Sequence, residues 1–307
     1  MSERLNTCVT LCGHSLPNPV MPASGTFGFG CEMAAWYNLN VLGAVVLKGT
    51  TAEERFGNPT PRIAECEAGL LNAIGLQNPG VQAVVTQEVP RLREKYNGTV
   101  IANVCGFSVE EYVQVARAFD ACEGVQILEV NISCPNVHAG GMAFGTSAAA
   151  AAAVAAAVKK AVKKPVFMKL SPNVTSIIEI ARACEEAGAD GLTLINTLLG
   201  MQIHPATGQA LVSTKTCGFS GPAILPVALR MVYEAAGAVN IPIIGAGGIA
   251  TADDVLRFIS AGAAAVQVGA QNLVDPFACP GIIEQLPVKM AEYGIQDLTS
   301  IRGRTRE

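Results

Sequence analysis

The chain contains eight short apolar runs of strand length, and stretches of helical pattern separate them. Most of these runs are continuous rather than alternating in polarity, as expected for strands that are covered on both faces of a parallel sheet. The segments "EEAGADGLTLIN" and "ISAGAAAVQVGA" share one plan, in which a helix end and a glycine precede a strand of small residues. The expected strands are Pro19–Ser24, Ala44–Lys48, Val100–Val104, Ile127–Ile132, Pro165–Leu170, Gly191–Asn196, Ile241–Gly245 and Ala264–Gly269.

Helical patterns fill the intervals between these strands. Ser147 can cap the start of the Ala-rich helix, and lysines 159, 160, 163 and 164 lie at its end, where positive charge suits the helix dipole. The expected helices are Gly80–Lys95, Val109–Cys122, Ser147–Val162, Ser176–Ala187, Pro222–Ala236 and Ala252–Ser260.

Eight strand–helix units predict an α/β fold, the (β/α)8 TIM barrel. We expect one domain over residues 1–307, because no Pro/Ser-rich linker or shift in composition divides the chain. A doubly wound open sheet is the alternative, and it would place a dinucleotide fingerprint after an early strand. The first strand instead runs into "SGTFGFG", which has neither that spacing nor a following acidic strand end. The barrel is therefore favoured.

Composition narrows the function classes. Only 15% of the residues are charged, against about 25% in an average domain, which indicates a buried subunit interface. The net charge of −4 argues against nucleic-acid binding, which needs a basic stripe. We expect no secretory signal and no membrane span, since the longest apolar run, residues 148–158, is shorter than the roughly 20 residues that a span requires. Scattered cysteines and histidines predict no metal site and a cytoplasmic protein with reduced thiols.

Polar residues gather at the carboxyl ends of the expected strands, where a (β/α)8 barrel carries its chemistry. A lysine at the end of an apolar strand, as in "AVVLKGT" and "PVFMKLS", is costly to desolvate unless it has an anionic partner. One such lysine can extend to solvent, but two lysines and three asparagines on one rim indicate a functional site. These residues are Ser24, Lys48, Asn103, Asn131, Ser133, Cys134, Lys169, Asn196 and Thr197.

Small residues follow the last two strands. Gly247 and Gly248 precede a helix in "IIGAGGIATADDV", and Gly269 and Ala270 follow the last strand in "VQVGAQNL". Such residues let backbone N–H groups approach a phosphate, and the loops after strands 7 and 8 are where barrels commonly hold one. These glycines could instead serve only tight turns. Their occurrence on adjacent strands favours a phosphate-bearing cofactor.

Cys134 lies just beyond the fourth strand and is followed by Pro135, so a helix cannot continue through it. Gly140 and Gly141 are possible hinges, and a thiol on a movable loop can act as a nucleophile or a proton acceptor. A nucleophile would need an oriented histidine partner, and no third residue that could orient His138 is evident. For Cys134, a role as proton acceptor is therefore favoured over a role as nucleophile. It is also favoured over a purely structural role for the thiol.

The segments "EVNISCPNVHAGGMAFGT", "LLNAIGLQNPG", "VVLKGTT", "FMKLSPN", "LINT" and "IIGAGGI" resemble FMN-dependent dihydroorotate dehydrogenases of class I, which use a catalytic cysteine. The likeness runs from "NPVMPASGTFGFG" to the last strand, and "AIGLQNPG" is similar to the NAD-linked subclass, class IB. The resemblance implies oxidation of (S)-dihydroorotate to orotate in de novo pyrimidine (UMP) biosynthesis. It also implies one FMN per chain, and an electron-transfer partner subunit that carries FAD and an iron–sulfur cluster, in a heterotetramer built on a homodimer of this chain.

Carried over by position, the resemblance makes Cys134 the base at C5, while the C6 hydride passes to FMN. The substrate would be held by Lys48, Asn72, Ala73, Ile74, Gly75, Leu76, Asn131, Asn196 and Thr197. The flavin would be lined by Ser24, Lys48, Gly49, Asn103, Asn131, Lys169, Ile195 and Gly221, and its phosphate by Gly247, Gly248, Gly269 and Ala270.

The sequence departs from the family pattern at two positions. Ala270 stands where a threonine is expected, and His138 where a lysine is expected, so we expect somewhat weaker FMN binding and an altered loop charge. Two other functions stay open from the residues. One is a dihydropyrimidine dehydrogenase-like flavin reductase, which shares the "SCP" loop, and the other is a non-catalytic phosphate-binding barrel.

Overall fold

The computed structural model describes residues 5–133 and 144–306, so Cys134 and the residues that follow it, up to 143, lie outside the described range. An eight-stranded, all-parallel sheet forms the centre of the molecule, with neighbouring strands in the order β3-β14-β13-β10-β9-β8-β7-β4. Its strands are β3 Val20–Pro22, β4 Ala44–Val46, β7 Thr99–Val104, β8 Ile127–Asn131, β9 Val166–Lys169, β10 Gly191–Leu194, β13 Ile243–Ala246 and β14 Ala265–Val268. Each lies at a predicted strand, with its ends shifted by a few residues.

The two edge strands of this sheet, β3 and β4, meet and close it into a barrel. The backbone N–H of Gly43, just before β4, donates to the carbonyl of Val20 in β3 at 2.9 Å. Only glycine fits there, since a Cβ on Gly43 would lie 2.2 Å from the carbonyl oxygen of Asn18. Closure confirms the (β/α)8 barrel, because it leaves neither edge of the sheet free for another chain.

Continuous burial explains why the strands could be recognised. Every residue of β7 and of β9 is buried, since one side chain faces the barrel interior and the next faces the helices outside. This double coverage removes the polar alternation of a half-exposed strand. The few polar residues in these strands therefore lie inside the barrel core or at its rim.

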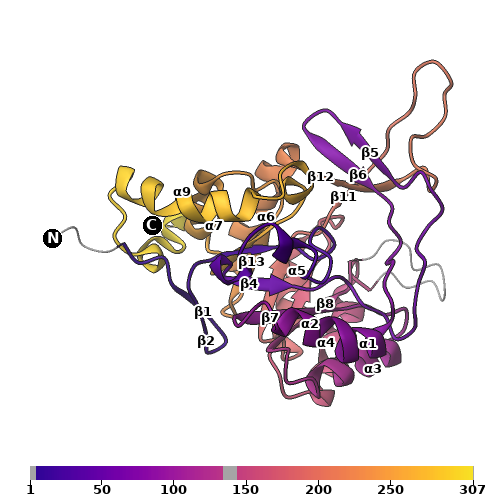
Figure 1. Ribbon diagram of the computed structural model, residues 1–307, viewed down its shortest axis with the longest axis horizontal. Helices are drawn as coiled ribbons and strands as arrows, with labels where there is room; N and C mark the ends of the chain where they lie inside the picture. Colours follow the sequence, from indigo (N-terminus) through magenta and orange to yellow (C-terminus); the bar gives the residue numbers. More distant parts are fainter. Residues whose placement is uncertain (1–4, 134–143, 307) are drawn as a thin grey trace.

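Helices surround the barrel (Figure 1), and α3, α4 and α5 pack against one another in sequence order. In the described ranges, no helix is both long enough and apolar enough to cross a membrane. The helices are α1 Val81–Ala83, α2 Val89–Arg93, α3 Val109–Asp120, α4 Ala148–Ala161, α5 Ile177–Glu186, α6 Leu225–Ala236, α7 Ala252–Ala261, α8 Gln271–Val274 and α9 Ala278–Glu292, with a π-helical turn η3 Val84–Glu88 and short 3-10 turns η1 Met33–Ala35, η2 Leu39–Val41, η4 Pro222–Ile224, η5 Leu298–Ile301 and η6 Arg304–Arg306.

Hydroxyl side chains begin several of these helices. The Ser147 hydroxyl accepts a hydrogen bond from the N–H of Ala150 at 3.4 Å, which confirms the predicted cap of α4. At α7, Thr251 and Asp254 form a reciprocal capping box, each side chain bonding the backbone N–H of the other. This box fixes the chain directly after the Gly247–Gly248 turn.

The helix predicted over residues 80–95 is divided in the structure. It consists of α1, the π-helical turn η3 and α2, and the last of these begins one residue before Pro90. Proline has no N–H for the carbonyl four residues back, and its ring pushes that carbonyl away. The wider turn before Pro90 accommodates both effects.

A second, antiparallel sheet was not predicted. It contains β5 Ile63–Cys66, β6 Gly69–Asn72, β11 Leu198–Gly200 and β12 Cys217–Ser220, in the order β11-β12-β6-β5. Its strands come from the connections after β4 and after β10, so it lies over the carboxyl-end rim of the barrel, beside the long β11–β12 loop (Figure 1). A further unpredicted hairpin, β1 Val9–Leu11 with β2 His14–Leu16, precedes the barrel.

We expect Thr251→Ala to lower the free energy of unfolding by about 1 kcal/mol, because it removes the oxygen that caps α7. Urea denaturation followed by circular dichroism measures the change. The matched control is Thr175→Ala, an exposed threonine whose hydroxyl bonds to no described residue. Equal losses in the two variants would contradict the capping role.

Candidate active site

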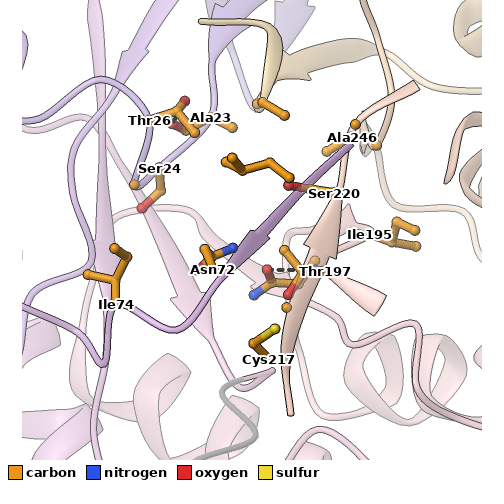
Figure 2. A pocket seen from close by; sticks show the side chains of 18 of the residues that line it. Ala23, Ser24, Thr26, Asn72, Ile74, Ile195, Thr197, Cys217, Ser220 and Ala246 are labelled. Atoms are coloured by element: carbon orange, nitrogen blue, oxygen red, sulfur yellow. Dashed lines mark hydrogen bonds between the residues drawn. The ribbon is translucent and has the colours of Figure 1, made fainter. Parts of the chain in front are cut away.

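A cavity of about 460 Å³ opens at the carboxyl ends of the barrel strands, under the antiparallel sheet. Its volume lies within the range of about 300–1,000 Å³ that is usual for small-molecule and cofactor sites. In Figure 2, Ser24 and Thr26 lie on one side of the cavity and Ile195 on the other. Asn72 of β6 and Thr197 both lie against Gly218 of β12, so the antiparallel sheet contributes directly to the wall.

The structure brings nearly all of the predicted site residues together. Asn103 and Ser133 are the exceptions among the described ones, because both are buried and neither lines the cavity. Cys134 lies outside the described residues, so its predicted role stays a prediction. The predicted residues that line the cavity are Ser24, Lys48, Gly49, Asn72, Ala73, Ile74, Gly75, Leu76, Asn131, Lys169, Ile195, Asn196, Thr197, Gly221, Gly247, Gly248, Gly269 and Ala270.

Lys48 supplies positive charge to one end of the cavity. It follows β4, and among the described residues no carboxylate lies within salt-bridge distance of its ammonium. Burial, together with the nearby Arg62 guanidinium, lowers the pKa of Lys48. A partly buried ammonium of this kind is suited to bind an anion. The negative charge would offset both the cost of burying the ammonium and its repulsion by the Arg62 guanidinium.

Amide and hydroxyl groups form a connected wall beside Lys48. The carbonyl oxygen of the Asn131 side chain accepts hydrogen bonds from the Ser133 hydroxyl at 2.6 Å and from the Asn196 amide at 3.3 Å. The Asn196 amide also donates to the Ser133 hydroxyl, and its oxygen accepts from the N–H of Thr197 at 2.8 Å. These bonds orient two carboxamides toward the cavity, where they can recognise a ligand rich in amide groups.

The cavity floor contains buried charge. Lys169 at the end of β9 and Glu129 in β8 form an ion pair of 3.2 Å, and both are almost completely buried. Asn103 donates to the same carboxylate oxygen of Glu129 at 2.7 Å. The Gln267 amide bonds both partners, accepting from Lys169 at 3.0 Å and donating to Glu129 at 2.5 Å.

Small residues shape another end of the cavity. Gly248 has φ +76°, and a Cβ there would lie 2.8 Å from the backbone nitrogen of Leu225, at the start of α6. The backbone therefore approaches closely where a side chain would block it, as a phosphate site requires. Ala270 is the N-cap residue directly before α8 and offers a backbone N–H but no hydroxyl, so the predicted departure from the family pattern lies at this end.

FMN fits these surroundings. The glycine-lined end offers room and backbone donors for a phosphate, and the Lys169 ammonium on the floor can face the electron-accepting ring of a flavin. The cavity also leaves the Lys48 and asparagine wall for a second, planar ligand. In residues 5–133 and 144–306, no group of three His, Cys, Asp or Glu side chains lies close enough together to hold a metal ion.

Several lining residues were missed from the sequence. About half of them belong to the antiparallel sheet or its flanks, such as Ile63, Leu199 and Cys217, and the sheet itself was not expected. Gln267 and Glu129 were missed although a signal existed. Each is a polar residue inside an apolar strand, in "AVQVGA" and "ILEVN", and such a residue needs a buried partner.

Comparisons with known proteins agree with this site. A sequence model of the family described as dihydroorotate dehydrogenase matches residues 6–290. A curated relative from Geobacillus kaustophilus (strain HTA426) is 56% identical over 297 residues, which cover 97% of this chain and 95% of the relative. A relative from Bacillus pumilus (strain SAFR-032) is also 56% identical, over 97% of this chain and 96% of its own. Both are named dihydroorotate dehydrogenase B (NAD(+)), catalytic subunit.

Proposed function

The chain belongs to the dihydroorotate dehydrogenase family, and from this premise we propose that it is the FMN-containing catalytic subunit of the NAD-linked enzyme, class IB. It oxidises (S)-dihydroorotate to orotate in de novo pyrimidine biosynthesis. The observation that carries this function is identity of about 55% over 97% of the chain to catalytic subunits of that name, joined to a barrel-end cavity with the required polar groups.

The cavity chemistry matches this substrate. Orotate is a planar anion whose ring presents amide donors and acceptors. We propose that Lys48 binds its carboxylate, because this ammonium has no carboxylate partner among the described residues. Asn72, Asn131 and Asn196, with Thr197, bind the ring, and the backbone of residues 73–76 lies along its edge. Dihydropyrimidines without a carboxylate leave Lys48 unpaired, which disfavours the uracil-reductase alternative.

When bound, FMN accepts the hydride that leaves C6 of the substrate. We propose that Ser24, Gly49, Ile195 and Gly221 enclose the cofactor, that residues 247, 248, 269 and 270 hold its phosphate, and that Lys169 lies at its pyrimidine edge. Asn103 acts from beneath, through Glu129. The missing hydroxyl at Ala270 removes one neutral hydrogen bond, worth roughly 0.5–1.5 kcal/mol, so FMN binding is weaker rather than lost.

We propose that Cys134 removes the C5 proton of dihydroorotate. A base is needed because hydride loss at C6 creates the double bond only if the C5 proton also departs. Ser133, the preceding residue, is held by hydrogen bonds to Asn131 and Asn196, so the chain enters this segment from a fixed point. His138 stands nearby in sequence in place of the expected lysine, and its charge below neutral pH can affect the thiol.

The names of the relatives imply a second subunit, and we propose that it carries FAD and an iron–sulfur cluster and passes electrons to NAD. We further propose a heterotetramer built on a homodimer of this chain, in the cytoplasm. Half-exposed apolar side chains support this assembly, because a partner subunit could cover them. They include Trp36, Leu199 and Phe277. Free cysteines among the described residues support a reducing compartment. Residues 1–307 would form one FMN-binding domain.

The function is tested with purified protein under anaerobic conditions. We expect a yellow preparation whose flavin absorbance bleaches on addition of dihydroorotate and not of dihydrouracil. Bleaching by dihydrouracil alone would favour the reductase, and a colourless preparation would favour a phosphate-binding barrel. Electron transfer to NAD should appear only after co-expression with a cluster-bearing subunit.

Lys48→Ala should weaken orotate binding by at least about tenfold, because a buried hydrogen bond to a charged group is lost. Because the pKa of Lys48 is lowered, the affinity of the wild-type protein for orotate should be highest below that pKa, where the ammonium is charged. It should fall as pH rises through that pKa, and this fall should occur at a lower pH than it would for an exposed lysine. The variant should lack this alkaline fall. Orotate titration of flavin absorbance over a pH series measures both. Lys160→Ala, at an exposed lysine of α4, is the control.

Cys134→Ala should keep its flavin but reduce it several orders of magnitude more slowly, since no group then takes the C5 proton. Cys134→Ser should also be slow near neutral pH, because an aliphatic hydroxyl loses its proton much less readily than a thiol and so supplies almost no anionic base. Stopped-flow absorbance after mixing with dihydroorotate gives the rates, and Cys8→Ala, at an exposed thiol, is the control. Near-wild-type reduction in the Ala variant would show that another group is the base.

A further inference from the structure

Glu129 is a carboxylate sealed beneath the cavity floor. Its side chain has no exposed surface, and it does not line the cavity itself. Both oxygens are engaged: one accepts from Asn103 at 2.7 Å and from Lys169 at 3.2 Å, and the other accepts from Gln267 at 2.5 Å. Glu129 therefore does not contact a bound ligand directly, and its hydrogen bonds reach the ligand through its partners.

Lys169 is the partner that reaches the ligand. Two of the three N–H donors of an ammonium are used by protein, one toward Glu129 and one toward Gln267 at 3.0 Å. Lys169 lines the cavity, so one donor is left for a ligand on the floor. The two protein bonds fix the direction in which that donor points.

Gln267 closes the arrangement into a ring. Its amide N–H donates to Glu129, so its oxygen is the atom that faces Lys169. Glu129, Lys169 and Gln267 thus form a closed cycle of hydrogen bonds from β8, β9 and β14. We call these residues the floor ring.

A purely structural role does not account for the floor ring. A buried ion pair is often no more stable than apolar residues of the same volume, because desolvating two charges offsets their attraction. The strands that carry the ring are otherwise apolar and fully buried apart from the rim residue Asn131, so apolar side chains could fill this space. The ring lies where a cofactor would meet the floor, which points to a role in tuning that cofactor.

We propose that Glu129 and Gln267 are positioning residues that hold the Lys169 ammonium aimed at the pyrimidine edge of the flavin. This inference rests on the proposed function, because it requires FMN in the cavity. Glu129 supplies the counter-charge that pairs with the buried ammonium, and Gln267 prevents Lys169 from turning fully toward Glu129. The aimed positive charge then stabilises negative charge that develops at the flavin N1–O2 edge.

The affinity of the bound flavin for sulfite measures the effect of the Lys169 charge without any turnover of substrate. Sulfite adds its sulfur lone pair to N5 of an oxidised flavin, an electron pair moves toward N1 and O2, and no group leaves. The adduct is anionic there, so its stability follows the positive charge at that edge. Absorbance titration at one fixed pH near neutrality gives the dissociation constant, and FMN content shows that each variant holds its cofactor.

We expect Glu129→Gln to weaken sulfite binding by at least about tenfold, because Lys169 loses its charged hydrogen-bond partner. A carboxylate acting only as a nearby negative charge predicts the opposite, since its removal would tighten sulfite. Gln267→Met should weaken sulfite in the same direction by a smaller factor, and it serves if the Glu129 variant does not fold. Unchanged or tighter sulfite binding in the variants that hold FMN would overturn the positioning role.

Thr193→Val is the matched control. Thr193 pairs with Lys169 across β9 and β10, is fully buried, and its hydroxyl has no hydrogen-bond partner among the described residues. Its sulfite affinity should equal that of wild type, whereas Lys169→Met should show the full loss. A colourless wild-type protein would refute the proposed function. A yellow wild type with unaffected floor-ring variants would refute only this inference.

Discussion

The hydrogen bond from Gly43 to Val20 closes the sheet, and closure is what makes one rim of eight separate strand ends. In an open sheet, Lys48 after β4 and Gly269 after β14 would lie near opposite edges, because β4 and β3 are the two ends of the strand order. The barrel places both at one cavity. Parallel strands also point every carboxyl end the same way, so side chains far apart in sequence meet without long loops.

Polar groups can be buried inside this barrel because they form hydrogen bonds and ion pairs with one another. Glu129, Lys169, Gln267 and Asn103 satisfy one another below the cavity, while Asn131, Ser133 and Asn196 do so beside it. Lys48 differs, since none of the described carboxylates pairs with it. The site thus has a floor whose charges are paired, with one Lys169 donor left for a cofactor, and an end at Lys48 that can attract an anionic substrate.

The barrel strands were predictable because burial on both faces leaves continuous apolar runs, which few other structures share. The antiparallel sheet was not predictable, since β5, β6 and β11 lack the continuous burial of the barrel strands and its two halves pair at long range, as Leu70 of β6 does with Ser220 of β12. Rim residues were found from their position at strand ends and from the family resemblance. Glu129 and Gln267 were not found, because the sequence shows a polar residue within a strand but does not show the partner that offsets the cost of burying it.

A crystal structure of the protein with FMN and orotate would show directly whether one flavin and one planar acid meet between Lys169 and Lys48. We expect the Lys169 ammonium within hydrogen-bond distance of the flavin pyrimidine ring and the Lys48 ammonium on the orotate carboxylate. FMN bound elsewhere, for example in the groove between α6 and α7 that Tyr233 and Tyr293 line, would contradict it.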